Sequence, residues 1–546
     1  MRESERKAAP EPKVNRWFGR PARWLSFVAG GAVPVLVFPD LDLSVLAWCA
    51  LVPALVLFAR APSGREAVAR GWWFGAGYLI AMLYWMAPEI GPGLVAVGAV
   101  FGGLYAPFAL AAHRLLRPPV TGRRAVLALI VLPGCWLVPE WARSYQGLGG
   151  PWDLYGASQW QHPAVLALAA VGGVWLVSVA LVLANVGLAL TLMTAASASR
   201  APAPLGAAGL VVFGVAAGAG PLAFALTPPP GVQRTATVAL VQPGVVNNPA
   251  ARADASETLT RQRTERHGVD LVVWGESSIN QDLTLPSARP LLTRIEALSA
   301  RDRAEILVSQ DATPPGKGHE KWGVLVAPSG IKGIYVKSRL VPFGEYIPFR
   351  SELGWLTAVS RAAGSNMTAG AGAHLMHAVD RSGKPLPVGV LTCFESAFGD
   401  MSRVDTDLGA RFIAYQSATS TFQGTWGPDQ HAALGALRAA ETGRPVVQAA
   451  LTGDSAAFDA RGRELAWLGQ SARGVVTVRL PLPAPASRTF YDRHGDYVMW
   501  AGVAVAAGFI LSGFLGRTGG GRSDHGAEYG IKHRADYEAA GEGEPR

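Results

Sequence analysis

Three side chains with complementary chemistry stand at separate points in the second half of the chain. Cys393, Glu276 and Lys337 each follow or end a short apolar run. A thiol can act as a nucleophile, a carboxylate as its base, and an amine as a stabiliser of negative charge. The other cysteines, Cys49 and Cys135, lie in long apolar segments, where a thiol usually packs as a small hydrophobe. The residue types therefore predict an activated cysteine, provided that the fold brings the three together.

The elements that must position these residues are the strands of an α/β domain. After a Pro-rich linker at 228–237, short β-branched runs alternate with amphipathic stretches. We expect strands at 236–242, 270–274, 305–309, 322–327, 333–337, 388–393 and 412–415, and helices at 251–267, 288–301 and 428–443. Strands separated by helices indicate a central sheet, and chemistry in such sheets gathers at strand ends.

The rest of the chain has the composition of a membrane protein. Of 546 residues, 50% are hydrophobic and only 16% are charged, which is too apolar for a soluble protein of this length. We predict about eight membrane-spanning helices, at 24–39, 43–59, 71–88, 92–113, 125–143, 164–196, 204–226 and 497–515. The net charge of +9 comes from arginines spread over loops and tails, so it does not indicate nucleic-acid binding.

Arginine and lysine predict how the spans are oriented. They occur in the N-terminal segment 1–23 and in alternate loops, whereas the turns at 39–42 and 88–91 contain neither residue. By the positive-inside rule, both termini lie in the cytoplasm. The seven-span membrane domain 24–227 then leads to a catalytic domain, 228–490, outside the cytoplasmic membrane. The tail 516–546, after the eighth span at 497–515, reads as a disordered cytoplasmic segment.

Three segments resemble a known family. They are Trp-Gly-Glu at 274–276, Lys-Ser-Arg-Leu-Val-Pro-Phe-Gly-Glu-Tyr-Ile-Pro at 337–348, and Cys-Phe-Glu at 393–395. They resemble the Glu–Lys–Cys triad of the nitrilase superfamily of carbon-nitrogen hydrolases, which stands on strand ends of an αββα sandwich. Placed between seven spans and an eighth, they are similar to its membrane-bound apolipoprotein N-acyltransferase family. This resemblance covers residues 24–515, including the loop 140–152 and the Arg-Pro segment 438–445.

The resemblance implies a reaction and roles for the triad. Cys393 would take an acyl chain from a membrane phospholipid as a thioester, with Glu276 as general base. Lys337, helped by a backbone N–H near Phe394, would stabilise the oxyanion. The α-amine of a diacylglyceryl-cysteine at the N-terminus of an apolipoprotein would then take the acyl chain. No metal or other cofactor is expected.

Several neighbouring residues are expected to assist. Glu345 and Glu395 would orient the lysine and the base, or serve only as ion-pair partners. Trp152, Tyr155 and Trp426 would line the entrance for lipid substrates, or belong to an ordinary aromatic belt at the membrane interface.

The sequence also departs from the family pattern, and two other functions stay open. The segment 418–422, Ala-Thr-Ser-Thr-Phe, replaces the usual Asn-Asp-x-Trp-Phe, which affects the lining of the site more than the triad.

One alternative function is that of a membrane-tethered amidase whose thioester is resolved by water. The other is an inactive lipid-binding or scaffold protein, which the intact Glu276, Lys337 and Cys393 disfavour.

Overall fold

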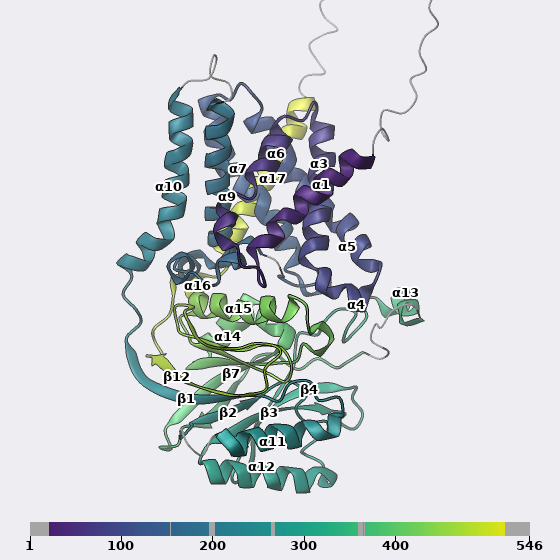
Figure 1. The fold of residues 1–546 in the computed structure, drawn as a ribbon, viewed down its shortest axis with the longest axis vertical. Coiled ribbons are helices and arrows are strands. Elements are labelled where there is room, and N and C mark those ends of the chain that lie inside the picture. Colours follow the sequence, from purple (N-terminus) through teal and green to yellow (C-terminus); the bar gives the residue numbers. More distant parts are fainter. Residues whose placement is uncertain are drawn as a thin grey trace, which may run out of the picture.

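The computed structural model describes residues 21–152, 154–195, 203–263, 268–358, 364 and 366–518. These residues form a helical domain packed on an α/β domain (Figure 1). Residues 1–20 of the predicted N-terminal segment and 519–546 of the predicted tail lie outside the described residues.

The helical domain is built from apolar helices that are interrupted at proline and glycine. Its main helices are α1 (Pro21–Ala32), α2 (Val52–Ala59), α3 (Gly64–Met82), α5 (Gly93–Phe101), α6 (Ala106–Leu116), α7 (Gly122–Arg143), α9 (Ala169–Ala195), α10 (Ala203–Leu226) and α17 (Tyr497–Thr518). Shorter ones are α4 (Ala87–Ile90), α8 (Pro163–Leu166) and α16 (Phe490–His494). Proline stands in the first turn of α2 and α6, where its missing N–H is tolerated. Within α9, Gly172 and Gly173 leave the helical conformation and form a kink.

Apolar helical stretches of the described residues coincide with most of the predicted membrane spans. Among the described residues, four helical stretches are long and apolar enough to cross a membrane: 93–116, 122–143, 169–195 and 204–226. Three shorter apolar helical stretches, 24–37, 44–59 and 497–513, coincide with other predicted spans. The number eight therefore stays a prediction.

In the described part of the α/β domain, the strands form two sheets of six strands each. The first has the order β12-β1-β2-β3-β4-β5, and the second has the order β11-β10-β9-β8-β7-β6. Their strands are β1 (Val232–Gln242), β2 (Leu271–Trp274), β3 (Glu305–Ala312), β4 (Glu320–Ala327), β5 (Gly330–Val336), β6 (Leu375–Val379), β7 (Pro385–Thr392), β8 (Phe412–Ser417), β9 (Val446–Ala450), β10 (Ser455–Phe458), β11 (Glu464–Leu468) and β12 (Gly474–Pro483).

Side chains alternate along each strand. One face of each sheet therefore packs against the other sheet, and the opposite face packs against a layer of helices. In β1, Val238 and Leu240 belong to the hydrophobic core between the sheets, whereas Ala239 and Val241 belong to a separate core. That separate core includes Ile295 of α12 (Arg289–Asp302). The helices α12 and α11 (Arg252–Arg263) lie side by side at the end of the molecule farthest from the helical domain (Figure 1). The helices α14 (Gly399–Asp407) and α15 (Gly427–Thr442) cover the second sheet, on the side facing the helical domain. The expected αββα sandwich is confirmed.

The predicted strands and helices all occur, with ends shifted by a few residues. The predicted helix at 251–267 is α11, and its last residues, 264–267, lie outside the described part of the chain. Five strands were not predicted: β6, β9, β10, β11 and β12. Of these, β12 is completed by its antiparallel pairing with β1, across more than 200 residues of sequence, which local pattern does not reveal.

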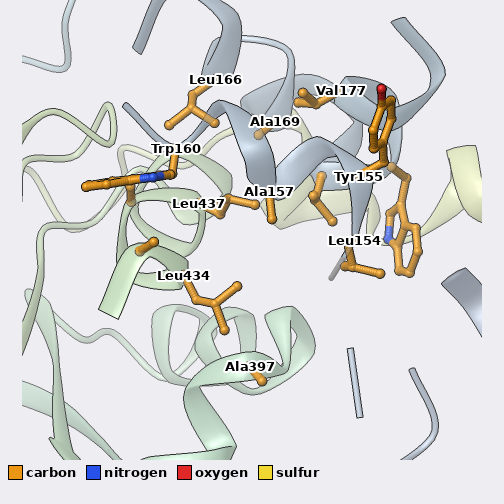
Figure 2. Close-up of a cluster of buried hydrophobic side chains, with 14 of the residues drawn as sticks. Leu154, Tyr155, Ala157, Trp160, Leu166, Ala169, Val177, Ala397, Leu434 and Leu437 are labelled. Carbon is orange, nitrogen blue, oxygen red and sulfur yellow. The ribbon is translucent and has the colours of Figure 1, made fainter. Parts of the chain in front are cut away.

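An apolar interface joins the two domains. Leu434 and Leu437 of α15 face Leu154, Ala157 and Leu166 of the helical domain (Figure 2), and all five are buried. The carboxylate of Glu441 in α15 accepts a hydrogen bond from the backbone N–H of Val174, 2.9 Å away, just after the kink in α9. The α15 layer is therefore held against the helical domain by packing and by a buried hydrogen bond.

Candidate active site

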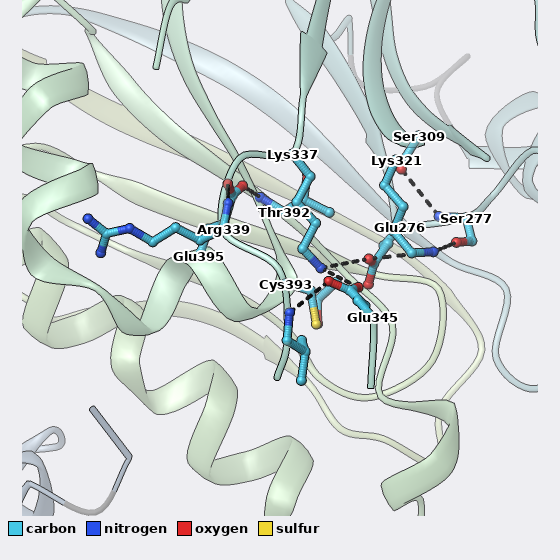
Figure 3. Close-up of polar contacts among 12 residues, drawn as sticks. Glu276, Ser277, Ser309, Lys321, Lys337, Arg339, Glu345, Thr392, Cys393 and Glu395 are labelled. Atoms are coloured by element: carbon cyan, nitrogen blue, oxygen red, sulfur yellow. Dashed lines mark hydrogen bonds and ion pairs between the residues drawn. The ribbon is translucent and has the colours of Figure 1, made fainter. Parts of the chain in front are cut away.

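Glu276, Lys337 and Cys393 meet between the two sheets, although 117 residues of sequence separate the first from the last. Figure 3 shows the thiol of Cys393 beside the amine of Lys337 and the carboxylates of Glu276 and Glu345. Each predicted triad residue follows a strand directly or by one residue: β2 precedes Glu276, β5 precedes Lys337, and β7 precedes Cys393. The fold thus brings together the three side chains that the sequence selected.

Glu276 is held at this position by a close approach of the two sheets. Its backbone N–H donates to the carbonyl of Ser417 at the end of β8, at 3.1 Å. A Cβ on the preceding residue, Gly275, would lie 1.9 Å from the backbone nitrogen of Leu451. Only glycine fits this contact, which explains the Gly in the Trp-Gly-Glu segment.

Lys337 is fully buried and lies between two carboxylates. Its Nζ is 2.7 Å from Oε1 of Glu345 and 3.4 Å from Oε1 of Glu276. Burial alone would lower the pKa of Lys337, but the charges of Glu276 and Glu345 outweigh it and hold the pKa well above its usual value. The amine therefore carries a positive charge at neutral pH. Glu345 is anchored in turn, because its Oε2 accepts a hydrogen bond from the backbone N–H of Val341 at 2.9 Å.

Cys393 occupies a tight turn after β7. Its φ is +49°, in the left-handed region that a residue other than glycine rarely adopts. Thr392 caps the following helical turn, Cys393–Ala397, together with Glu395. Burial raises the pKa of the Cys393 thiol to about 12, and the charge of Glu276 adds to the shift, whereas Lys337 opposes it. In the free protein the thiol is therefore protonated at neutral pH, so a nucleophilic attack requires a base.

Glu395 connects the cysteine turn to the lysine segment. Its Oε2 accepts from the backbone N–H of Thr392 at 2.7 Å. Its Oε1 accepts from the backbone N–H groups of Ser338 and Arg339 and from the hydroxyls of Tyr335 and Ser338, at 2.8 to 3.0 Å. The structure thus places Glu395 as a clamp between the two segments, without an ion pair to Lys337.

The sequence interpretation missed a second lysine beside the site. Lys321 of β4 places its Nζ 3.7 Å from Oε1 of Glu276, 2.9 Å from Oδ1 of Asp311 and 2.6 Å from Oγ of Ser277. Burial would lower the pKa of Lys321, but the charges of Glu276 and Asp311 outweigh burial and raise it. Strand alternation could have identified Lys321 from the sequence. Lys321 shares a face of β4 with Leu325, whose side chain lies in the core between the sheets.

His431 of α15 lies behind the nucleophile. One ring nitrogen, Nε2, is 2.8 Å from Oγ of Ser396 and 3.1 Å from the carbonyl of Cys393, and the other, Nδ1, is 3.1 Å from Oγ of Ser417. Burial lowers the pKa of His431 to about 4, so the ring is neutral at physiological pH. It contributes hydrogen bonds to the turn rather than a charge.

Aromatic side chains connect the nucleophile to the helical domain. Phe394 lies 6.2 Å, centroid to centroid, from Trp152, and Trp152 lies 5.4 Å from Trp85. Trp426 packs on Tyr84 at 5.3 Å. Trp152 and Trp426 are both half-buried along this connection.

The third aromatic residue predicted for the entrance has different surroundings. Tyr155 is fully buried, packs on Trp136 at 5.3 Å and donates its hydroxyl to the carbonyl of Ala47. It lies inside the helical domain, which argues against a place at the entrance. Sequence spacing put it near Trp152 but did not indicate which of the two side chains points inward.

Among the described residues, no group of three His, Cys, Asp or Glu side chains is arranged to hold a metal ion. The side chains that meet at the site are a thiol, carboxylates and an amine. Such a set is suited to acyl transfer through a covalent intermediate.

Comparison with known proteins agrees with this geometry. Residues 30–187 match the family described as apolipoprotein N-acyltransferase N-terminal domain, and residues 237–486 match the carbon-nitrogen hydrolase family. An apolipoprotein N-acyltransferase of Sinorhizobium fredii is 33% identical over 440 residues, which cover 76% of this chain and 77% of the relative. The chain belongs to the apolipoprotein N-acyltransferase family.

Other apolipoprotein N-acyltransferases match along almost their whole length. That of Chlorobaculum tepidum is 28% identical over 514 residues, covering 87% of this chain and 92% of the relative. A crystal structure of a carbon-nitrogen hydrolase from Helicobacter pylori G27 aligns with a TM-score of 0.36 and 15% identity, over 45% of this chain and 89% of that one.

Proposed function

We propose that this chain transfers an acyl chain from a membrane phospholipid to the α-amine of the N-terminal diacylglyceryl-cysteine of apolipoproteins. The observation that carries the proposal is the meeting of Glu276, Lys337 and Cys393 in one site (Figure 3), where Phe394, next to the nucleophile, packs near Trp152 of the helical domain. Both substrates are held in lipid, so an active site next to membrane helices suits them. Membership of the apolipoprotein N-acyltransferase family supports the same reaction.

In the first half of the reaction, Cys393 takes the acyl chain. Because burial keeps its thiol protonated, Glu276 accepts the proton as Sγ attacks the carbonyl carbon of the phospholipid ester. The tetrahedral oxyanion is stabilised by the positive charge of Lys337. When the intermediate collapses, the ester C–O bond breaks, and the lysophospholipid leaves with the proton from Glu276. An acyl thioester remains on Cys393.

In the second half, the thioester gives the acyl chain to an amine. The neutral α-amine of the acceptor attacks the thioester carbonyl, and Glu276 takes the proton that the nitrogen loses. Collapse breaks the C–S bond, forms an amide and returns the sulfur to a thiol by transfer of that proton. Glu345 and Glu395 act as positioning residues, through the Lys337 ion pair and through the clamp on the Cys393 turn.

The proposed orientation places both termini in the cytoplasm and the catalytic domain, 228–490, outside it. Seven spans in 24–227 and an eighth at 497–515 give this arrangement. Support comes from the basic end of α6, since Arg114 in its last turn stacks on Phe509 of α17. The C-terminal end of α17 lies at the end of the helical domain remote from the sheets (Figure 1). The non-basic turn at 39–42 lies at the opposite end, where the carbonyl of Pro39 accepts from Gln430 of α15. The protein would thus reside in a bacterial cytoplasmic membrane.

Access for lipid substrates is proposed along the aromatic connection from Trp85 through Trp152 to Phe394. These rings lie between the helical domain and the nucleophile, and Trp152 and Trp426 are partly exposed. The altered segment 418–422 adjoins the same region, because Phe422 packs on Trp85 at 4.8 Å. The departure from the family pattern therefore affects the lining of this route.

The direct test is to trap the thioester. Full-length purified protein is incubated with a diacyl phospholipid and analysed by intact mass, and an acyl adduct is expected that Cys393→Ala abolishes and Cys49→Ala retains. Adding a diacylated lipopeptide with a free α-amine should remove the adduct and yield a triacylated product. Absence of an adduct with every phospholipid tried would overturn the proposal. An adduct released only as free fatty acid, with lipopeptide present, would favour the amidase alternative.

A further inference from the structure

A pocket of about 380 Å³ lies where the helical domain meets the α14–α15 layer, apart from the triad. Trp141 at the end of α7, Trp175 in α9 and Trp500 at the start of α17 contribute aromatic walls. Arg339, Phe398 and Arg438 contribute the wall from the catalytic domain. We call this space the junction pocket. Its volume is in the range of sites for small ligands or for parts of larger ones.

Arg438 is one of the residues that line this pocket, and its guanidinium has buried hydrogen-bond donors that are not satisfied among the described residues. Its side chain is 2% exposed, and one nitrogen, Nη1, is 2.7 Å from a carboxylate oxygen of Glu441. Its Nε and Nη2 have no hydrogen-bond partner within the part of the chain that the structure describes. Buried guanidinium N–H groups are seldom left unpaired, because losing water without a replacement partner is costly. These two donors indicate that the pocket accepts a ligand with anionic oxygen.

A second guanidinium, that of Arg339, borders the same space. It pairs with Asp400 and stacks over the ring of Phe398, 4.4 Å from its centroid. Figure 3 shows this side chain extending away from the thiol of Cys393, with Glu395 between them. The junction pocket therefore lies on the other side of the Glu395 clamp from the reacting atoms.

The location of the pocket identifies the kind of anion. Trp141 and Trp500 pack together at 5.8 Å, and Trp500 is 54% exposed at the beginning of an apolar helix. Tyr145, also a lining residue, is 52% exposed. Tryptophan and tyrosine concentrate at the level of lipid head groups. Toward the N-terminal end of α7, away from Trp141, the apolar side chains of Val126 and Ile130 are exposed. A phospholipid combines an anionic head group with apolar chains, so it fits a pocket with aromatic side chains at its edge and apolar helices beside it.

We propose that the junction pocket binds the phosphodiester head group of an outer-leaflet phospholipid that is not the acyl donor. The phosphate oxygens accept hydrogen bonds from Arg438 and Arg339, and the glycerol region lies against the tryptophans. The bound head group contacts Phe398, whose ring packs edge-on against Phe394 at 4.9 Å. Phe394 directly follows the nucleophile, so the lipid supports the Cys393 turn from behind. This inference rests on the proposed orientation in the membrane.

The test uses a phospholipid that cannot donate an acyl chain. Full-length protein in detergent is titrated with dialkyl-ether phosphatidylglycerol or dialkyl-ether phosphatidylethanolamine, and bound lipid is counted by native mass spectrometry. We expect retention of an ether lipid in the junction pocket, in addition to any at the donor site, and a loss of its affinity of about tenfold or more in Arg339→Gln, as for a hydrogen bond to a charged group. Trp500→Leu, which changes an exposed side chain, should weaken binding as well.

Arg461→Gln is the matched control, because Arg461 also stacks on a phenylalanine, Phe224, but lies outside the junction pocket. It should retain the lipid as the unchanged protein does. Equal retention by Arg339→Gln, Trp500→Leu and the control would overturn the proposal. Full competition by millimolar inorganic phosphate would also overturn it, since the site would then bind a free anion.

The outcome is separable from that of the proposed function. If ester phospholipid still forms the Cys393 thioester while no ether lipid is retained, the junction pocket proposal fails alone. If ether lipid is retained but no thioester forms, the proposed reaction fails and the lipid site remains.

Discussion

Replacing Glu395 with glutamine tests whether this residue is a structural clamp. The carboxylate is fully buried and accepts hydrogen bonds at both oxygens, from Thr392 on one side and from Tyr335, Ser338 and Arg339 on the other. A glutamine has the same shape but only one acceptor oxygen. With its oxygen facing the larger group of donors, its NH₂ faces the N–H of Thr392. At least one hydrogen bond is therefore lost, and two donors are brought together.

The size of the effect follows from these contacts. A buried donor left unsatisfied costs about 1–3 kcal/mol, and the remaining hydrogen bonds lose the strengthening that a charged acceptor provides. Part of this loss is offset, because burial already raises the pKa of Glu395 and glutamine removes the charge that burial disfavours. We expect a net loss of about 2 kcal/mol in the free energy of unfolding. For a domain of this size that corresponds to a melting temperature lower by about 4–8 °C.

The assay combines thermal unfolding of the detergent-purified protein with the single-turnover rate of thioester formation. Because Glu395 ties the Cys393 turn to the segment after Lys337, Glu395→Gln should slow acylation by about tenfold to a hundredfold. Glu464→Gln, at an exposed position in β11, is the control and should change neither quantity. An unchanged melting temperature with abolished acylation would refute the clamp, and would assign Glu395 a direct part in the chemistry.

Three further predictions concern the surroundings of the nucleophile. Lys321→Met removes an ammonium group 3.7 Å from the proposed general base, and should lower the single-turnover acylation rate about tenfold or more while the melting temperature falls by only a few degrees; an unchanged rate would contradict this role. Because the pKa of Cys393 is raised to about 12, its alkylation by iodoacetamide, followed by peptide mass spectrometry, should accelerate steadily from pH 7 to pH 10, and a plateau below pH 9 would be inconsistent with that value. Gly150→Ala places a Cβ 2.7 Å from the ring of Phe394 at a φ of +82°, and should destabilise the protein by about 2–4 kcal/mol in thermal unfolding. Gly147→Ala, with nothing within 4 Å, should not, and equal effects of the two changes would refute the packing argument.

Much of the fold could be predicted because its signals are local. The strands β2 and β7, which precede Glu276 and Cys393, are mostly buried apolar runs, and β5, which precedes Lys337, contains Ile331, Ile334 and Val336. The helices α12 and α15 show helical periodicity. The strands that were missed contain less regular patterns or many alanines, as in β9 and β10. They form because neighbouring strands supply hydrogen-bond partners, which a local pattern does not contain.

Residue type by itself determined the chemistry of this protein. A cysteine, a glutamate and a lysine after separate strands indicated an activated nucleophile, and the long apolar segments indicated a membrane protein. The acyl transfer was what the resemblance to the nitrilase superfamily implied. These features can be read from the sequence because they depend only on the side chain and on its immediate neighbours along the chain.

Only the tertiary structure decided which polar residues share the site and how each one is used. It brought Lys321 to Glu276 from a neighbouring strand, made Glu395 a clamp, and enclosed Tyr155 within the helical domain. It also left Arg438 with unpaired donors at a junction that two domains build together. The physical reason is that burial and charge interactions act through space, between residues whose separation along the chain carries no information about their distance.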